Sequence, residues 1–150
     1  MDIEVLKNDL IDDEGICYEI YLDHKGYSTA GIGHLLTTMD PEYSFPVGTE
    51  VSPERVNEWF EEDINNVILD CNLLFCDFYS LPEEVKLVIA NMMFNLGRTR
   101  LAKFKKFIAA IDNTAWEAAA DEMIDSLWYT QVPNRANRLC NRMRNIRHDD

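Results

Sequence analysis

Residues 13–34 read DEGICYEIYLDHKGYSTAGIGH. Two acids in this stretch stand at expected structural boundaries: Glu14 where a helix should end, and Asp23 where a hairpin should turn. Three glycines follow close together, at Gly26, Gly31 and Gly33. Glycines at this density let the backbone take up positive φ or approach a ligand closely, and a plain core hairpin does not need so many. The stretch is therefore predicted to form a wall of an active site.

The sequence around this stretch predicts a short helix followed by a hairpin. Apolar residues recur at helical spacing over residues 3–13, and Gly15 directly afterwards is a favourable residue to end a helix. The helix dipole disfavours a negative charge at that end, where Glu14 stands. Residues 18–22 alternate as a strand does, a turn signal follows, and residues 27–32 can return as the second strand. A loop with one more short strand is expected over residues 35–49.

The rest of the chain carries helical patterns. Ser52 as N-cap and Pro53 at the first position predict a long helix over residues 53–74. Further helices are expected over 85–96, 98–111 and 116–123, and from 125 and from 133 onward.

The predicted fold is therefore α+β and mainly helical, with two lobes in one domain over residues 1–150. A small hairpin lobe is expected over about residues 13–60, then the long connecting helix, then a helical lobe over about 75–150. The helix over residues 3–13 is expected to pack on the helical lobe. A cleft between two such lobes is a common place for a ligand to bind.

The charge balance restricts the partners. The chain has 14 basic and 27 acidic residues and a net charge of −13, so nucleic acid and anionic membranes are poor partners for the whole molecule. No apolar run reaches the roughly 18 residues that a membrane span needs. Arginines crowd the C-terminus, which predicts either a local basic face or an amphipathic helix with a solvated arginine face: Arg135, Arg138, Arg142, Arg144 and Arg147.

The four cysteines indicate reduced thiols rather than a disulfide framework. They are irregularly spaced and expected to be mostly buried, and the N-terminus is acidic and lacks the apolar run of a signal peptide. Synthesis and retention in a cytoplasm are therefore expected. Cys71 and Cys76 lie five positions apart, which is poor spacing for a shared metal ligand set. No metal or cofactor is predicted.

Glu14 and Asp23 suggest a specific chemistry. They lie on different elements, so their carboxyl groups can face each other in different environments. Glycoside hydrolysis requires such a pair, with one carboxyl protonated and the other ionised. Thr29 can then hold a water between them. The alternative is a surface glutamate, a turn aspartate and a strand threonine, and the spacing alone leaves both interpretations open.

Three motifs strengthen the first interpretation. They are the spacing of Glu14, Asp23 and Thr29 within residues 13–37, the stretch NMMFNLG at 91–97, and WYTQVPNRA at 128–136. Together they resemble the T-even bacteriophage lysozymes, the virus-type muramidases. The resemblance covers about residues 1–143, with the motifs in the family's order.

The resemblance implies hydrolysis of the β-1,4 bond between N-acetylmuramic acid and N-acetylglucosamine in peptidoglycan, with inversion. Glu14 is then the general acid, and Asp23 acts with Thr29 on the attacking water. The implied role is that of an endolysin, a monomer that acts on glycan strands and needs a separate membrane pore to reach the wall from an infected cell's cytoplasm. Two alternatives stay open: a non-catalytic wall-binding or virion structural module with this fold, and an enzyme that cuts chitin-like polymers.

The resemblance also assigns residues that contact the sugar chain: Leu35, Phe94, Asn95, Phe107 and Glu122. At Phe107 the family has a small polar residue, and at Glu122 it has an amide. Asn95 replaces another amide and can hydrogen-bond an acetamido group.

Supporting roles follow from the same resemblance. Arg135 is expected to orient Asp13 or Glu14, and His34 is expected to pair with Asp63. The pairs Trp59-Phe60 and Trp128-Tyr129 are expected in the core. The chain departs from the family in its acidity, because typical members are basic, and in its short end at residues 147–150, where the family has a longer tail.

Overall fold

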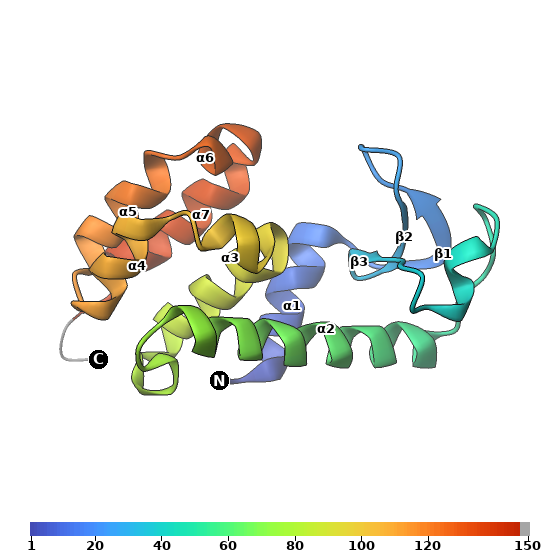
Figure 1. Cartoon of the computed structure of the whole chain (residues 1–150), viewed down its shortest axis with the longest axis horizontal. Coiled ribbons are helices and arrows are strands. Elements are labelled where there is room, and N and C mark those ends of the chain that lie inside the picture. Colours follow the sequence, from blue (N-terminus) through green and yellow to red (C-terminus); the bar gives the residue numbers. More distant parts are fainter. Residues whose placement is uncertain (148–150) are drawn as a thin grey trace. The chain divides into compact units, whose positions relative to one another are not determined.

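Across residues 1–147, the part of the chain that the computed structural model describes, seven α-helices and one three-stranded antiparallel sheet form (Figure 1). The α+β, mainly helical fold class is thus confirmed. The chain divides into a hairpin unit, Lys7–Asn66, and a helical unit made of Met1–Leu6 and the residues from Val67 onward. The short C-terminal end that was compared with the longer family tail includes residues 148–150, which lie outside the part of the chain that the structure describes. The predicted domain boundaries stay predictions.

The N-terminal helix ends where its sequence predicts. Helix α1 spans Ile3–Glu14, one residue longer than expected. Gly15 follows with φ +76°, and its N–H donates to the carbonyl of Ile11 at 2.8 Å. This left-handed residue closes the helix in the way that favours glycine. Glu14 is therefore the last helical residue.

The sheet is a hairpin with one short added strand. Strand β1 (Cys17–Leu22) pairs antiparallel with β2 (Ser28–Gly31), and β2 pairs antiparallel with β3 (His34–Leu35). The turn between β1 and β2 closes when Gly26 N–H donates to the carbonyl of Asp23 at 2.9 Å. The predicted hairpin and extra strand are both present, and a 3-10 helix follows at Pro41–Ser44.

The long helix is as predicted. Helix α2 spans Pro53–Leu74, and the Ser52 hydroxyl oxygen accepts the N–H of Arg55 at 3.1 Å. Within the hairpin unit its buried face supplies much of the core, which confirms the expected burial of Trp59-Phe60. The buried residues of this core include Ile20, Ile32, Leu36, Val56, Trp59 and Phe60.

The helical unit is built from five further α-helices and a short 3-10 helix, Phe78–Ser80. The α-helices are α3 (Glu83–Leu101), α4 (Lys105–Asp112), α5 (Trp116–Ile124), α6 (Leu127–Gln131) and α7 (Pro133–Arg144). Their shared core is almost completely buried and includes Phe78, Ile89, Met92, Leu101, Phe107, Ile111 and Trp128.

The predicted helix over residues 98–111 is wrong. Gly97 breaks the helical path with φ 78° and ψ 163°, but the next helical piece ends at Leu101, and α4 begins only at Lys105. Both Leu101 and Phe107 are buried. On one continuous helix they would point about 120° apart, given roughly 3.6 residues per turn. The intervening turn lets both side chains enter the core. No local pattern in the sequence indicates this turn.

Of the five C-terminal arginines, Arg138 and Arg147 are exposed, whereas the other three are held by the protein. Helix α7 is amphipathic, but Arg135 is buried and Arg142 donates to the carboxylate of Glu84. Arg144 pairs with Glu117 and with Asp121, at 2.6 Å in each case. Acids on neighbouring helices thus neutralise two of the five charges that the sequence alone shows as a basic cluster.

The cysteines are free thiols, as predicted. Cys71 and Cys140 are buried and Cys17 is half-buried, whereas Cys76 is the exposed exception to the expectation of mostly buried thiols. Burial raises the pKa of Cys71 to about 12. The Cys76 thiol donates a hydrogen bond to the Asp112 carboxylate at 3.3 Å, and this bond raises the pKa of Cys76. Over the described part of the chain, no helix is both long and apolar enough to span a membrane.

Candidate active site

Glu14 lies against Gly33 within the hairpin unit. A methyl group at Gly33 would lie 2.7 Å from Glu14 Oε2 and 3.2 Å from Glu14 Cβ. Gly33 also has φ +60°, a conformation that disfavours every residue with a side chain. The half-buried carboxyl group of Glu14 therefore occupies space that only a glycine leaves open.

Replacing Gly33 by alanine is expected to lower turnover by displacing the Glu14 carboxyl, because the added methyl overlaps Oε2. The matched control is Gly48→Ala, since Gly48 has φ +92° but nothing within 4 Å of the added methyl. Both variants carry the cost of a left-handed alanine, about 1–2 kcal/mol of stability. Thermal unfolding and peptidoglycan turnover of the two variants separate the effects. Equal losses of turnover at equal stability would contradict the placement of Glu14.

Asp23 is held by the hairpin turn. Its Oδ1 accepts the backbone N–H groups of Lys25 and Tyr27, each at 2.9 Å. The bond from Tyr27 is the largest influence and lowers the pKa of Asp23; slight burial opposes it, and the bond from Lys25 lowers it further. The second oxygen, Oδ2, makes no hydrogen bond to any residue within the described range. Asp23 is thus an ionised carboxylate with one oxygen available to a ligand or a water.

Thr29 lies on β2, in the middle of the sheet, and is buried. Its hydroxyl donates to the carbonyl of Tyr27 at 2.9 Å, so the oxygen lone pairs remain as acceptors for a water. The opposite residues in the two strand pairings are Tyr21 on β1 and Leu35 on β3. Leu35, a predicted sugar contact, is 48 % exposed, so a ligand can reach it.

Tyr21 is a candidate that the sequence reasoning missed. Burial first raises its pKa, and the charges of Cys17, Glu14 and Asp23 raise it further. The phenol therefore lies within electrostatic range of both predicted catalytic carboxylates, and its hydroxyl makes no hydrogen bond to a described residue. The signal in the sequence was its place near the end of the strand expected over residues 18–22, which leads into the turn at Asp23.

His34 and Asp63 form the expected pair, and a second carboxylate joins it. His34 Nδ1 lies 2.7 Å from Asp63 Oδ2, and Nε2 lies 3.1 Å from Asp40 Oδ2. The imidazole stacks on Trp59 with ring centroids 4.8 Å apart, and the Trp59 indole N–H donates to Asp40 Oδ1 at 3.2 Å. Arg55 also lies over the Trp59 ring, 4.7 Å from its centroid. The sequence reasoning missed Asp40, Trp59 and Arg55 as members of this cluster.

The cluster favours the charged imidazolium. Burial, the largest influence, lowers the pKa of His34, but the hydrogen bonds and charges of Asp63 and then Asp40 outweigh it, so the pKa is raised. Burial likewise raises the pKa of Asp40, but hydrogen bonds from Thr37, His34 and Trp59 outweigh it and lower the pKa. His34 and Asp40 are therefore both charged over a wider pH range in the folded chain than in the unfolded one.

This pairing makes stability depend on pH. The pKa of His34 is raised in the folded chain. Its contribution to the free energy of unfolding is therefore complete below the unfolded pKa of about 6.5 and is lost as pH rises through the folded pKa. The pKa of Asp40 is lowered in the folded chain. Its contribution to the free energy of unfolding is therefore complete above the unfolded pKa of about 3.9 and is lost as pH falls through the folded pKa. We expect His34→Gln to cost about 2 kcal/mol near pH 5.5, where both terms are present, and less at alkaline pH.

Urea unfolding at several pH values measures this effect. The control is His24→Gln, which removes an exposed histidine of the hairpin turn and should leave the pH dependence unchanged. If His34→Gln showed the same stability difference from wild type at all pH values, the charged cluster would not be the cause.

The helical unit holds a second group of predicted residues. Phe94 and Asn95 lie half-buried on α3, and Asn95 Oδ1 accepts the indole N–H of Trp128 at 2.7 Å. The Asn95 amide nitrogen bonds to none of the described residues and can donate to a ligand. Arg135 Nε donates to Asn91 Oδ1 at 2.9 Å; its expected action on Asp13 or Glu14 stays a prediction.

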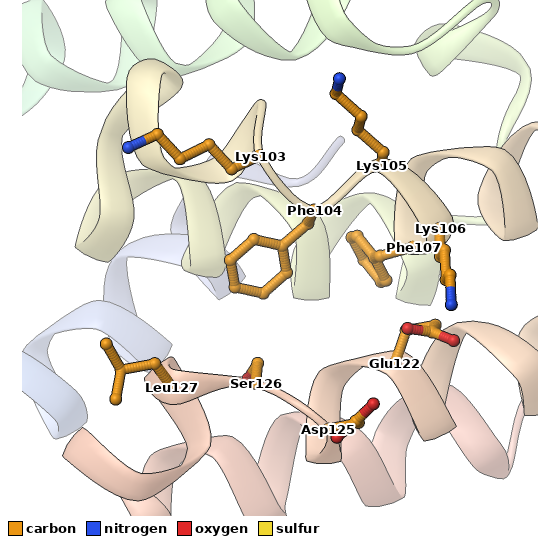
Figure 2. Close-up of a pocket in the computed structure, with 9 residues that line it drawn as sticks. All are labelled: Lys103, Phe104, Lys105, Lys106, Phe107, Glu122, Asp125, Ser126 and Leu127. Carbon is orange, nitrogen blue, oxygen red and sulfur yellow. The ribbon is translucent and has the colours of Figure 1, made fainter.

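Phe107 and Glu122 meet at one pocket of the helical unit. The pocket has a volume of about 470 Å³. Figure 2 shows Phe104 and Phe107 on one wall and Glu122 with Asp125 on the other. Phe107 is only 1 % exposed, so it supplies an apolar floor rather than an open platform. The remaining lining residues are Lys103, Lys105, Lys106, Ser126 and Leu127.

The predicted residues thus fall into two groups, each within one unit. Glu14, Asp23, Thr29, His34, Leu35 and Asp63 belong to the hairpin unit, and Phe94, Asn95, Phe107, Glu122 and Arg135 belong to the helical unit. In the described residues no three His, Cys, Asp or Glu side chains gather to hold a metal ion. In the hairpin unit the predicted catalytic groups are the carboxyl groups of Glu14 and Asp23 and the hydroxyl of Thr29.

Known proteins are similar in sequence to this chain over most of its length. The model of the family named Phage lysozyme matches residues 12–145. The chain is 33 % identical over 156 aligned positions to "Probable T4-type lysozyme 2" of Dictyostelium discoideum, covering 91 % of this chain and 92 % of that protein.

Two phage proteins are also similar over part of their length. "Peptidoglycan hydrolase gp36" of Pseudomonas phage phiKMV is 33 % identical over 83 % of this chain and 13 % of that protein. "Pre-baseplate central spike protein Gp5" of Enterobacteria phage T4 is 29 % identical over 85 % of this chain and 25 % of that protein.

Proposed function

Because the chain belongs to the phage lysozyme family and is a glycoside hydrolase that degrades peptidoglycan, we propose that it is an inverting muramidase. Its substrate bond is the β-1,4 linkage between N-acetylmuramic acid and N-acetylglucosamine. The observation that carries the proposal is the arrangement around Glu14 and Asp23. One carboxyl group sits against Gly33 at a helix end, and the other is kept ionised by two backbone N–H groups of a turn.

The proposed reaction assigns one role to each group. Glu14 protonates the leaving glycosidic oxygen as the bond to the anomeric carbon breaks. A water attacks from the opposite face, held by Thr29 Oγ1 and the open oxygen of Asp23. Asp23 accepts the proton of that water, and its negative charge stabilises the cationic character of the anomeric carbon. Tyr21 is the residue opposite Thr29 in the sheet, and its hydroxyl can donate to substrate or water.

The experiment is the digestion of purified peptidoglycan with measurement of new reducing ends. NMR of the first product, recorded before mutarotation, identifies the anomer. Inversion of a β bond gives the α anomer first, which is the expected result. A β anomer would remove the water-positioning role of Thr29, and the absence of new reducing ends would overturn hydrolysis itself.

We further propose that the enzyme acts as an endolysin-type lysozyme in host cell lysis. It would be made in the cytoplasm, act as a monomer, and reach the wall through a separate membrane pore. The similarity to a phage spike protein supports a second candidate function, a wall-binding or structural module of a virion. Pulldown on purified peptidoglycan without release of reducing ends would favour that module. Chitin digestion tests whether the chain also cuts a polymer without muramic acid.

A further inference from the structure

A pocket of the hairpin unit contains none of the predicted catalytic or sugar-contact residues. It has a volume of about 440 Å³ and forms where the first turn of α2 meets the start of β1 (Figure 1). Asp23 lies five positions beyond Tyr18, which is up to roughly 16 Å along a strand at about 3.3 Å per residue. The pocket is therefore separate from the turn that carries Asp23. Its lining residues are Lys7, Ile16, Tyr18, Ile32, Pro53, Glu54, Val56 and Asn57.

The pocket has an apolar floor and an aromatic wall. Ile32 and Val56 are each only 3 % exposed, so they form the floor. Tyr18 is 47 % exposed, and its hydroxyl makes no hydrogen bond to a residue that the structure describes. A tyrosine ring offers a large apolar face with a polar group at its edge. The pocket therefore suits a ligand that has an apolar face and polar edges, as a sugar ring does.

Two hydrogen-bond donors in the pocket are held in place. Lys7 Nζ donates to Asn57 Oδ1 at 2.9 Å and lies 5.5 Å from the centroid of the Phe60 ring. Lys7 forms no ion pair with any described residue. Because the Asn57 oxygen is occupied, its amide nitrogen is left to donate to a ligand, as that of Asn95 is in the helical unit. These donors match the carbonyl oxygen of an amide group.

A second pocket adjoins the first. It has a volume of about 460 Å³ and shares Ile16 and Tyr18 with the first pocket. Glu19 and Glu50, which lie opposite each other in a β-bridge, also line it. Both side chains are exposed, and their carboxylates can accept hydrogen bonds from hydroxyl groups. Because Tyr18 borders both pockets, a ligand longer than one sugar can occupy the two together.

The charges of the two pockets favour a neutral ligand. Three glutamates line them, Glu19, Glu50 and Glu54, and these repel an anion. Lys7 repels a cation from the first pocket. A polymer that carries hydroxyl and amide groups but no charge meets neither repulsion.

We propose that the two pockets form a second binding site for N-acetylated glycan strands, apart from the site of cleavage. The Tyr18 ring takes the apolar face of one sugar, and Asn57 with Lys7 donates to its acetamido oxygen. The carboxylates of the second pocket accept hydroxyl groups of the next sugar. The proposal rests on the proposed function, because it names a second contact with the same substrate.

Such a site gives an acidic enzyme a means of staying on its substrate. The net charge of −13 opposes attraction to an anionic wall, whereas contacts with a neutral sugar do not depend on that charge. A strand that is held at one site is present at a raised effective concentration at the other. The second site should therefore increase the occupancy of the catalytic carboxyl groups by polymeric substrate.

NMR of the Glu14→Gln variant tests the proposal without cleavage. The probe is a soluble, peptide-free N-acetylglucosamine tetramer. Its titration should shift the side-chain amide resonance of Asn57 and the backbone amide resonance of Tyr18, with saturation. Shifts confined to the residues around Asp23, Thr29 and Leu35 would overturn the second site.

The same titration at higher salt tests the neutral character of the ligand contacts. The shifts at Asn57 and Tyr18 should persist in about 0.5 M NaCl, where the screening length is only roughly 4 Å. Their loss at that salt concentration would overturn the assignment of a neutral sugar.

Retention on purified peptidoglycan locates the contact at the two pockets. In the Glu14→Gln background, Tyr18→Ala should weaken association about tenfold, equivalent to about 1.4 kcal/mol, and Asn57→Ala should also weaken it. The matched control is Tyr43→Ala, because Tyr43 is 50 % exposed in the same unit and lines neither pocket. Retention equal to that of the parent in both pocket variants would overturn the proposal. Because these measurements need no cleavage, the absence of new reducing ends with the wild-type chain would instead overturn the proposed function.

Discussion

Replacing Glu14 by glutamine should lower the turnover number on peptidoglycan by about 10³-fold, because the amide cannot give a proton to the leaving oxygen. The amide is nearly the same size as the carboxyl group, so it still fits against Gly33. Substrate affinity should therefore change little, and the loss should appear in kcat rather than in KM. Release of reducing ends from purified peptidoglycan measures it.

The matched control for this prediction is Glu19→Gln. Glu19 is an exposed glutamate on β1 of the same hairpin unit, so its replacement changes the net charge by the same amount. Its turnover should stay near that of wild type. Equal activity of Glu14→Gln and wild type would remove Glu14 from the role of general acid.

Replacing Asp23 by asparagine should lower turnover by about 10²–10³-fold, because the attacking water loses the anionic acceptor of its proton. The amide oxygen can still accept the N–H groups of Lys25 and Tyr27, which hold Asp23 Oδ1 at 2.9 Å. The turn should therefore survive, and thermal stability should change much less than activity. The control is Asp12→Asn, which replaces an exposed aspartate on α1 of the same unit.

The pH profile adds a second measurement of Asp23. Its pKa is lowered, first by the backbone N–H of Tyr27, so it stays ionised as pH falls below the ordinary value of about 3.9. The wild-type kcat/KM should fall on the acidic side only below that value, as Asp23 gains a proton. Residual activity of Asp23→Asn should lack this acidic decline. A variant profile with the same decline would assign it to another group.

Part of the acidity of the chain serves ion pairs within the helical unit. A net charge of −13 opposes long-range attraction to an anionic wall. Three acids of the C-terminal half, Glu84, Glu117 and Asp121, nevertheless have structural partners, since they pair with Arg142 and Arg144 of α7.

The sequence by itself determined the elements whose signals are local. Helix α1 ends at Gly15 and helix α2 begins after Ser52 because a left-handed glycine and a capping hydroxyl act within one helical turn. The hairpin turn follows from Asp23 and Gly26 for the same reason. The motifs around Glu14, Asp23 and Thr29 likewise sufficed to indicate the family, and the His34–Asp63 pair followed from it.

Only the tertiary structure decided the features that depend on contacts between different elements. The turn after Leu101 exists because Leu101 and Phe107 both enter one core, and Arg142 and Arg144 of α7 are neutralised by acids on other helices. Asp40 joins His34, and Gly33 makes room for Glu14, through contacts that no local pattern encodes. Local backbone preferences are properties of a few neighbouring residues, whereas packing and charge pairing depend on the folded arrangement of the whole unit.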